Sequence, residues 1–121
     1  MAFRLDTLNG ITVGIAELNG RLVAENSTIL QKTCSDWQQK TPFLVFDCSN
    51  LDFIDSSGLG TIVGCLRKAL EKNGDIKLAG LNAKVAMVFE LTKAKKLFSI
   101  FSNAGEAAAS FAASPVSSKT Q

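Results

Sequence analysis

The sequence predicts a single α/β domain with a mixed sheet of four to five strands and about four helices. Asn9-Gly10 stands between two β-like runs, which is a strong signal for a two-residue hairpin turn. The run Phe43–Phe46 is apolar throughout, as is typical of a strand buried on both faces of a sheet. Helical patterns then alternate with short strand-like runs, which indicates parallel strands joined by crossovers. Crossovers of one hand, wound in one direction, would cover one face of the sheet with helices.

The expected strands follow from alternation and from the residues that interrupt it. After the hairpin turn, the run Ile11–Leu18 alternates apolar with small or polar residues, and Asn19-Gly20 is expected to end it. The buried run Phe43–Phe46 is expected to end where polar residues begin at Asp47. The remaining strands are expected at Ile76–Ala79 and Leu97–Phe101.

Four helical patterns lie between and after these runs. The expected helices cover residues 25–39, 57–73, 82–91 and 103–112. Pro42 would stop the first and Gly74 the second, while Asn82 and Asn103 would cap the last two. In the first helix the expected buried face contains Ile29, Leu30, Cys34 and Trp37, with Gln31, Lys32, Ser35 and Gln38 mostly opposite. In the second it contains Leu59, Ile62, Val63, Leu66 and Leu70.

The composition excludes several classes of chemistry. Histidine and tyrosine are absent, so no Ser-His-Asp or Cys-His catalytic pair can form, and we expect no enzyme, no cofactor and no metal site. The net charge of +2 gives no strong positive field that would attract nucleic acid. No apolar run is long enough to span a membrane. Cys34, Cys48 and Cys65 stand in apolar surroundings, which favours buried, reduced thiols and a cytoplasmic location.

The domain is expected to cover residues 1–112. The tail, residues 113–121, is rich in serine and has too little apolar content to offset the entropy of ordering it, so we expect it to be disordered.

The segment Asn50–Gly60 carries the functional signal. It lies between the buried strand and the clearest helix, at the carboxyl end of a strand, where open α/β sheets place their binding sites. Asp55, Ser56 or Ser57 would cap the helix, because short oxygen-bearing side chains accept the free amide hydrogens of its first turn.

The helix that follows has glycines on its outer face. At 100° per residue, that face contains Ser57, Gly60, Thr61, Gly64, Arg67, Lys68 and Glu71. Each glycine costs the helix about 1 kcal/mol relative to alanine. Gly60 and Gly64 therefore indicate either that the backbone of a partner approaches this face or that the helix packs closely within its own domain.

The string Leu51-Asp52-Phe53-Ile54-Asp55-Ser56-Ser57-Gly58-Leu59-Gly60 resembles the signature of STAS domains, in particular of bacterial anti-sigma factor antagonists. The resemblance continues through Leu66 and Lys77–Gly80. It implies that an anti-sigma factor serine kinase phosphorylates the first serine of the pair, here Ser56. The unphosphorylated form would bind that kinase and release the sigma factor, and a serine phosphatase would be a further partner.

Carried over by position, the resemblance implies a partner-binding surface on the turn and helix. That surface would contain Asp55, Ser56, Ser57, Gly58, Gly60, Thr61, Gly64, Arg67 and Lys68. Two segments depart from the family pattern. Many antagonists carry an acidic residue near the position of Val23, in a loop that engages the kinase and its nucleotide, and here the nearest acidic residue in that loop is Glu25. In the second segment, Thr92–Lys96, lysines stand in a turn where the family usually has small or polar residues.

Two other functions remain open at this stage. The chain could be a STAS module of another assembly, such as a stressosome-like scaffold or the cytosolic subunit of a lipid-transport ATPase. It could also bind nucleotides, with the turn at residues 55–60 as a phosphate cradle. The turn lacks the lysine of a P-loop, however, and Asp47, Asp52 and Asp55 would repel phosphate.

Overall fold

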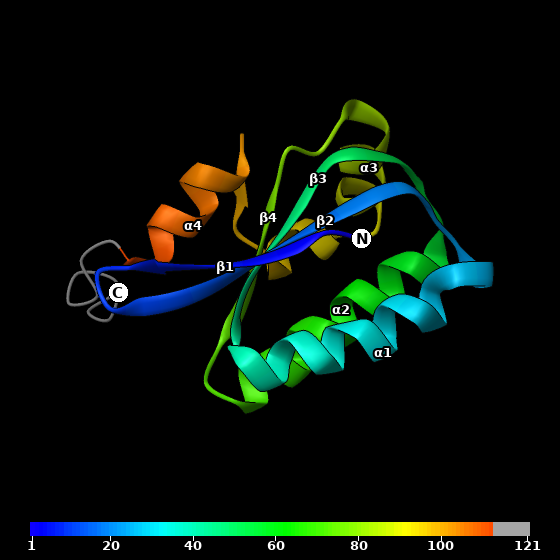
Figure 1. Cartoon of the computed structure of the whole chain (residues 1–121). Helices are drawn as coiled ribbons and strands as arrows, with labels where there is room; N and C mark the ends of the chain where they lie inside the picture. Colours follow the sequence, from blue (N-terminus) through cyan, green and yellow to red (C-terminus); the bar gives the residue numbers. More distant parts are fainter. Residues whose placement is uncertain (113–121) are drawn as a thin grey trace.

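A computed structural model describes residues 1–112, which form one mixed sheet with four α-helices and so confirm the predicted fold class (Figure 1). The expected tail, residues 113–121, lies outside the described residues. In chain order the elements are β1 (Phe3–Leu8), β2 (Ile11–Leu22), α1 (Ala24–Lys40), β3 (Phe43–Ile54), α2 (Ser56–Glu71), β4 (Asp75–Ala79), α3 (Ala83–Leu91), the 3-10 helix η1 (Ala94–Leu97), β5 (Ile100–Phe101) and α4 (Ala104–Ala112).

The sheet has its strands in sequence order, β1-β2-β3-β4-β5. Only the first pair among these strands is antiparallel, and it closes at the predicted hairpin, where Leu8 pairs with Ile11. Asn9 and Gly10 both have positive φ, 50° and 82°. A turn that matches the twist of the two strands requires that conformation, and asparagine and glycine adopt it at least cost.

Strands β2 and β3 are each 12 residues long, so the expected ends at Leu18 and Phe46 are wrong. The polar stretches beyond those points continue the sheet because they pair with each other in parallel. The added pairs are Asn19 with Asn50, Gly20 with Leu51, Arg21 with Phe53 and Leu22 with Ile54. Two register shifts interrupt this part of the ladder, and Gly20 has a φ of 72° there. As a result, the two strands end side by side.

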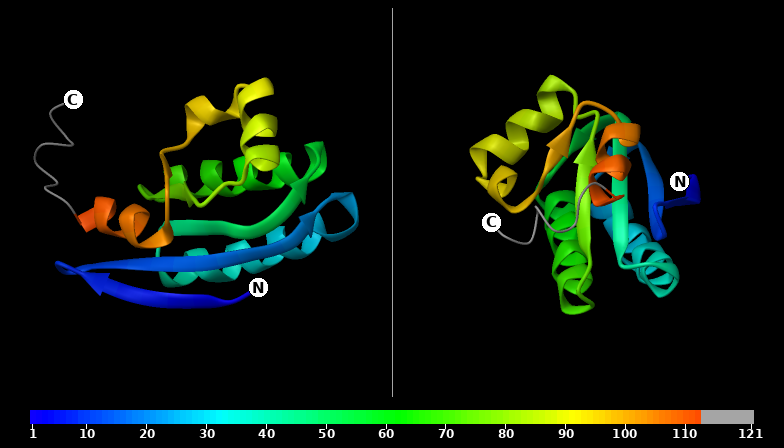
Figure 2. Two further views of the ribbon diagram at one scale, coloured as in Figure 1. Left: turned by 90° about the horizontal axis from the view of Figure 1, so that it is seen from above. Right: turned by 90° about the vertical axis from the view of Figure 1, so that its left-hand side faces the viewer.

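The helices cover both faces of the sheet, which corrects the expectation of one covered face. Helices α1, α2 and α3 enclose the larger core, in which Trp37 stacks on Phe3 at 5.1 Å between ring centroids and meets the edge of Phe46. Helix α4 packs on the opposite face, against Val13 and Val45 among others (Figures 1 and 2). It follows the last strand and is not a crossover, so the handedness rule does not constrain it.

Two apolar residues that the helical patterns placed in the core are exposed. Leu70 is 54% exposed and Ile29 is 58% exposed. In α2 the buried stripe contains Gly58, Leu59, Ile62, Cys65, Leu66 and Ala69. Ala69 continues this series, and Leu70 lies one residue past it, about 100° further around the helix.

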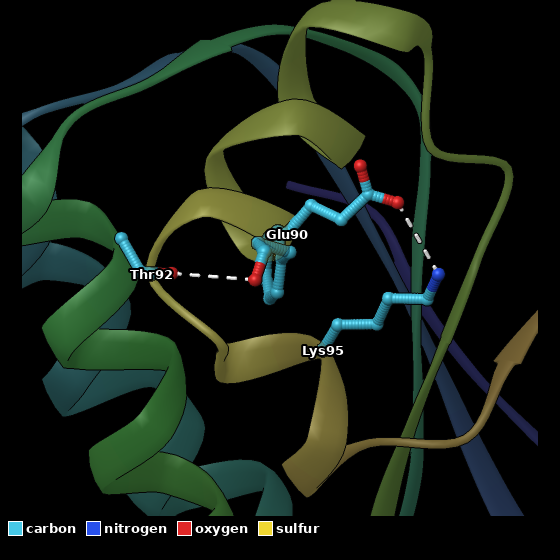
Figure 3. A network of polar contacts seen from close by, with 4 residues as sticks. Glu90, Thr92 and Lys95 are labelled. Carbon is cyan, nitrogen blue, oxygen red and sulfur yellow. Dashed lines mark hydrogen bonds and ion pairs between the residues drawn. The ribbon is translucent and has the colours of Figure 1, made fainter.

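The expected strand Leu97–Phe101 is shorter than predicted. Only Ile100 and Phe101 pair with β4, and Leu97 is the last residue of η1. A turn at Lys93, whose φ is 65°, redirects the chain after α3. Figure 3 shows the polar contacts of this turn: Lys95 Nζ lies 3.3 Å from Glu90 Oε2, and the Thr92 hydroxyl donates to the Phe89 carbonyl. These contacts fix the turn to the end of α3.

Substitution of the two neighbouring leucines of α2 tests this assignment of faces. Leu66→Ala should lower the free energy of unfolding by roughly 2–5 kcal/mol, because Leu66 is 4% exposed and its loss leaves a cavity. Leu70→Ala should change it by no more than about 0.5 kcal/mol. Urea denaturation measures both, and similar losses in the two variants would contradict the assignment.

Candidate functional site

Asp55 joins the starts of two helices. It is the N-cap of α2, where its Oδ1 accepts a hydrogen bond from the Gly58 amide at 2.9 Å. Its Oδ2 accepts from the Ala24 amide, in the first turn of α1, at 3.1 Å. The Asp55 amide donates to the Leu22 carbonyl at 3.2 Å, which continues the pairing of β2 with β3. Of the three residues expected to cap the helix, Asp55 does so, and α2 begins at Ser56.

The hydrogen bonds of the Asp55 carboxylate have an electrostatic consequence. The donated bond from Gly58, and after it the bond from Ala24, hold the pKa of Asp55 below its ordinary value of 3.8, against an opposing effect of desolvation. The charged form is therefore the one that the site stabilises. A fixed negative charge stands at the shared N-terminal end of α1 and α2.

Glycine serves two different purposes in α2. Gly58 is buried, and a Cβ atom there would collide with the carbonyl oxygen of Leu22, so the close approach of β2 requires glycine. A Cβ at Gly60 or Gly64 would meet no atom within 4 Å. The interpretation that these two glycines allow close packing within the domain is therefore wrong, and they leave bare backbone facing open space.

Two grooves flank this bare stretch of helix. The α1–α2 groove has a volume of about 360 Å³, and its walls come from the two helices. The α2–η1 groove has a volume of about 410 Å³ and is bounded by α2, Leu97 and the turn at Thr92–Ala94. Gly60 lines both grooves. The helix thus forms a ridge between two hollows.

The residues expected at the partner-binding surface are distributed over this ridge. Ser57, Gly60, Thr61, Gly64 and Lys68 line the α1–α2 groove. Ser56, Gly60 and Arg67 line the α2–η1 groove. The two serines are both exposed but border different grooves. Gly58 alone among the expected residues of α2 is buried, so it shapes the turn from beneath.

The residues that form the opposite walls of the two grooves were not predicted from the sequence. Gln31, Ser35 and Gln38 of α1 face α2, although their polarity had placed them mostly on the outer face. Gln38 is 4% exposed, and its Nε2 donates to the Cys65 carbonyl at 2.9 Å. No local pattern marks such a residue, because its partner is a backbone carbonyl on another helix. Thr92 and Lys93, in the turn that departs from the family pattern, border the other groove.

The loop that departs from the family pattern has a structural role. Val23 is the N-cap of α1 and is 9% exposed, and its amide donates to Asn26 Oδ1 at 2.9 Å. Its apolar side chain is therefore part of the fold at the point where the helix begins. Glu25 is exposed, directly follows the residue whose amide bonds Asp55, and is the acidic residue of this loop.

The described residues can be searched for metal ligands, membrane-spanning helices and disulfides. Within residues 1–112, no group of three or more Cys, Asp or Glu side chains is placed to hold a metal ion. None of the helices there has the length and apolar content to cross a membrane. All three cysteines are buried and free, as expected.

Comparison with known proteins agrees with this architecture. The STAS domain family model matches residues 2–107. The anti-sigma F factor antagonist of Paenibacillus polymyxa is 28% identical over 91 residues, which cover 74% of this chain and 78% of that protein. The anti-sigma-B factor antagonist of Bacillus subtilis (strain 168) is 25% identical over 92 residues, which cover 76% and 82%.

Solved structures show the same fold. A crystal structure from Thermotoga maritima, described as a candidate anti-sigma factor antagonist, superposes with a TM-score of 0.78 at 26% identity, covering 89% of this chain and 92% of that one. The murine Solute Carrier 26 family member A9 anion transporter contains the fold as well, with a TM-score of 0.67 at 21% identity over 83% of this chain and 17% of its own. That likeness concerns the fold alone.

Acid titration tests the role of Asp55. Because its folded-state pKa is depressed, its contribution to stability is present above the unfolded value of 3.8 and is lost as the pH falls through the folded value. Asp55→Asn keeps a cap for Gly58 but loses the charged acceptor for Ala24. The variant should be less stable at pH 7 and should lose less stability on acidification, as measured by urea denaturation across pH.

Asp52→Asn removes the same charge from an exposed position nearby and controls for net charge. If the pH dependence of Asp55→Asn matched that of the parent, the carboxylate would not be joining the two helices.

Proposed function

The chain belongs to the STAS domain family, and from this premise we propose that it is an anti-sigma factor antagonist that acts in the cytoplasm. Its relatives in Paenibacillus polymyxa and Bacillus subtilis carry that description. The observation that carries the proposal is the exposed ridge of α2, where Ser56 stands one turn from the bare backbone of Gly60. Such a surface suits a protein partner, because glycine lets another chain approach the helix backbone.

The partner that we propose is an anti-sigma factor with serine kinase activity, bound while Ser56 is unphosphorylated. Ser56 is the first residue of α2 and is exposed, so a kinase can reach its hydroxyl without unfolding the domain. The Asp55 carboxylate beside it already accepts two backbone hydrogen bonds, which leaves the Ser56 side chain outside the cap. Ser57, by contrast, borders the groove on the α1 side.

Phosphorylation of Ser56 would act on the complex more than on the free domain. A phosphate adds about −1.5 to −2 charges at pH 7. In the free domain the helix N-terminus favours an anion by roughly 0.3–1 kcal/mol, and water screens the repulsion from Asp55. In a complex the partner would have to desolvate this group next to a carboxylate, at a cost of several kcal/mol if it finds no cation. A serine phosphatase would restore binding.

A second function has one observation in its favour. The fold of this chain is also found in an anion transporter, so the same ridge could dock into another assembly in which phosphorylation plays no part. The two proposals differ in one respect that can be measured: only the first requires that affinity for the partner depend on Ser56.

Gly64→Leu tests whether the ridge is the binding surface. The new side chain would project into open space, and leucine is a better helix former than glycine by up to about 1 kcal/mol. The melting temperature of the isolated domain should therefore stay level or rise, as followed by circular dichroism. Binding to the anti-sigma factor that the parent protein retains in a pull-down should be lost through steric block.

Leu70→Ala is the matched control on the same helix, because Leu70 lines neither groove. Full affinity of the Gly64→Leu variant would place the interface elsewhere on the domain.

Substitution of the two serines tests the switch. Ser56→Ala should keep binding and resist phosphorylation, whereas Ser56→Asp should bind at least about tenfold more weakly, equivalent to 1.4 kcal/mol. Both variants should melt near the parent temperature, and Ser57→Ala should still be phosphorylated on Ser56 and lose affinity when it is. Isothermal titration with the anti-sigma factor measures affinity, and mass spectrometry locates the phosphate. Phosphate on Ser57, or unchanged affinity after full modification of Ser56, would refute the mechanism.

A further inference from the structure

Two cysteines meet at the bottom of the α1–α2 groove. Cys34 belongs to α1 and Cys65 to α2, and both line the groove while being only 2% and 4% exposed. Gln38, one turn after Cys34 on α1, donates its Nε2 hydrogen to the Cys65 carbonyl at 2.9 Å, so the two cysteines lie close to each other on the facing sides of the helix pair. The chain therefore brings together, from positions far apart in the sequence, two sulfur atoms that share one small opening to solvent.

The geometry of packed helices makes a bond between these sulfurs feasible. Helix axes pack roughly 8–10 Å apart, and Cα atoms lie about 2.3 Å from each axis, so Cα atoms that face each other come within roughly 3–5 Å. A disulfide needs about 4.4–6.8 Å between Cα atoms. Ser35 and Gly64, the chain neighbours of the two cysteines, are small and also line the groove.

The two thiols are electrostatically unequal. The interaction between the two thiols lowers the pKa of Cys65, against the effect of burial, and raises the pKa of Cys34 together with burial. The positive charge of Lys68 lowers the pKa of both. Cys65 is thus the thiol that more readily becomes a thiolate, the form that attacks electrophiles. Cys34 is the thiol that keeps its proton.

The third cysteine provides a contrast within the same chain. Cys48 lies in β3 with no exposed surface, and burial raises its pKa to about 12. It does not line the α1–α2 groove. Cys48 therefore serves as a comparison within the chain: a buried thiol that has no place in the groove.

We propose that Cys34 and Cys65 are an oxidative modification site, at which a hydroperoxide that enters the α1–α2 groove converts the two thiols into a disulfide. The groove, at about 360 Å³, admits a molecule of this size, and its lining includes several hydroxyl and amide groups that can hold it: Gln31, Ser35, Gln38, Ser57 and Thr61. This inference goes beyond the proposed function and does not depend on it.

The reaction has two steps. The Cys65 thiolate sulfur attacks the O–O bond of the hydroperoxide, an S–O bond forms, and the alkoxide or hydroxide that leaves takes up a proton. The Cys34 sulfur then attacks the sulfenic sulfur of Cys65, the S–S bond forms, and the hydroxyl group leaves as water with the Cys34 proton. In sum, two thiols are oxidised by two electrons and the hydroperoxide is reduced to an alcohol, or to water, with release of a second water.

The product would fix α1 to α2 immediately beside the binding ridge. Gly64 directly precedes Cys65, and Ser57, Gly60 and Thr61 line the same groove. A disulfide here would hold the groove at one width and prevent its side chains from adapting to an occupant.

Hydrogen peroxide applied to the fully reduced, folded protein tests the proposal. The intact mass should fall by about 2 Da, the two hydrogens lost on disulfide formation. Peptide mapping without reduction should show Cys34 linked to Cys65, and the count of reactive thiols in denaturant should fall from three to one, that of Cys48. Dithiothreitol should restore all three. A folded protein that keeps its mass, or a disulfide that includes Cys48 or joins two chains, would overturn the proposal.

Single substitutions separate the roles of the thiols. Cys48→Ser should form the disulfide at the parent rate. Cys34→Ser should accumulate sulfenic acid on Cys65, trapped with dimedone, whereas Cys65→Ser should trap much less on Cys34. The reverse order of trapping would overturn the assignment of Cys65 as the attacking thiol. The parent measurement stands by itself if either variant fails to fold.

Discussion

The hydrogen bonds of one carboxylate hold the functional end of this domain together. Asp55 accepts from the first turns of both α1 and α2, so the two helices start from a common point at the edge of the sheet. Both helix N-termini carry partial positive charge, and one negative side chain satisfies an amide in each. The relative position of the two helices, and with it the width of the groove between them, depends on this arrangement.

That arrangement is possible only because β2 and β3 end together. The pairing of Leu22 with Ile54 lies beyond two register shifts, in stretches that are too polar to resemble core strands. The backbone bonds continue regardless, because parallel pairing needs only aligned peptide groups and not apolar side chains. The Leu22 carbonyl then lies so close to α2 that position 58 excludes any side chain. One glycine is thus required by the fold, whereas Gly60 and Gly64, a turn away, are required by nothing inside the domain.

This separation matters for the chemistry of a switch. A residue that is modified in the folded state must be exposed, and its modification must leave the fold intact. Ser56 satisfies both conditions because Asp55, and not Ser56, satisfies the helix amides. The cysteine pair is arranged differently: its thiols are buried in the packed interface, and access to them depends on the groove. The same helix therefore carries both proposed sites: the outward one for a charged modification and the recessed one for oxidation.

The sequence by itself determined the fold class, the hairpin, the helix positions and the segment that carries the site. These follow from local rules: the positive φ of Asn9 and Gly10, the apolar run at Phe43–Phe46, and caps such as Asn82, whose side chain accepts from Val85. The unusual glycines of α2 could also be recognised from the sequence, because the free-energy cost of a glycine in a helix does not depend on distant residues.

Only the tertiary structure decided which atoms meet across elements. The continuation of β2 and β3, the burial of Gln38 against a carbonyl of α2, the exposure of Leu70 and the contact of Cys34 with Cys65 all depend on where a second segment lies. The placement of α4 on the far face is of the same kind. Periodicity reports how apolar each face of a helix is, but it carries no information about the partner that the face meets. The candidate site depends on such contacts between segments, of Asp55 with Ala24 and of α1 with α2. Only the tertiary structure could therefore show it.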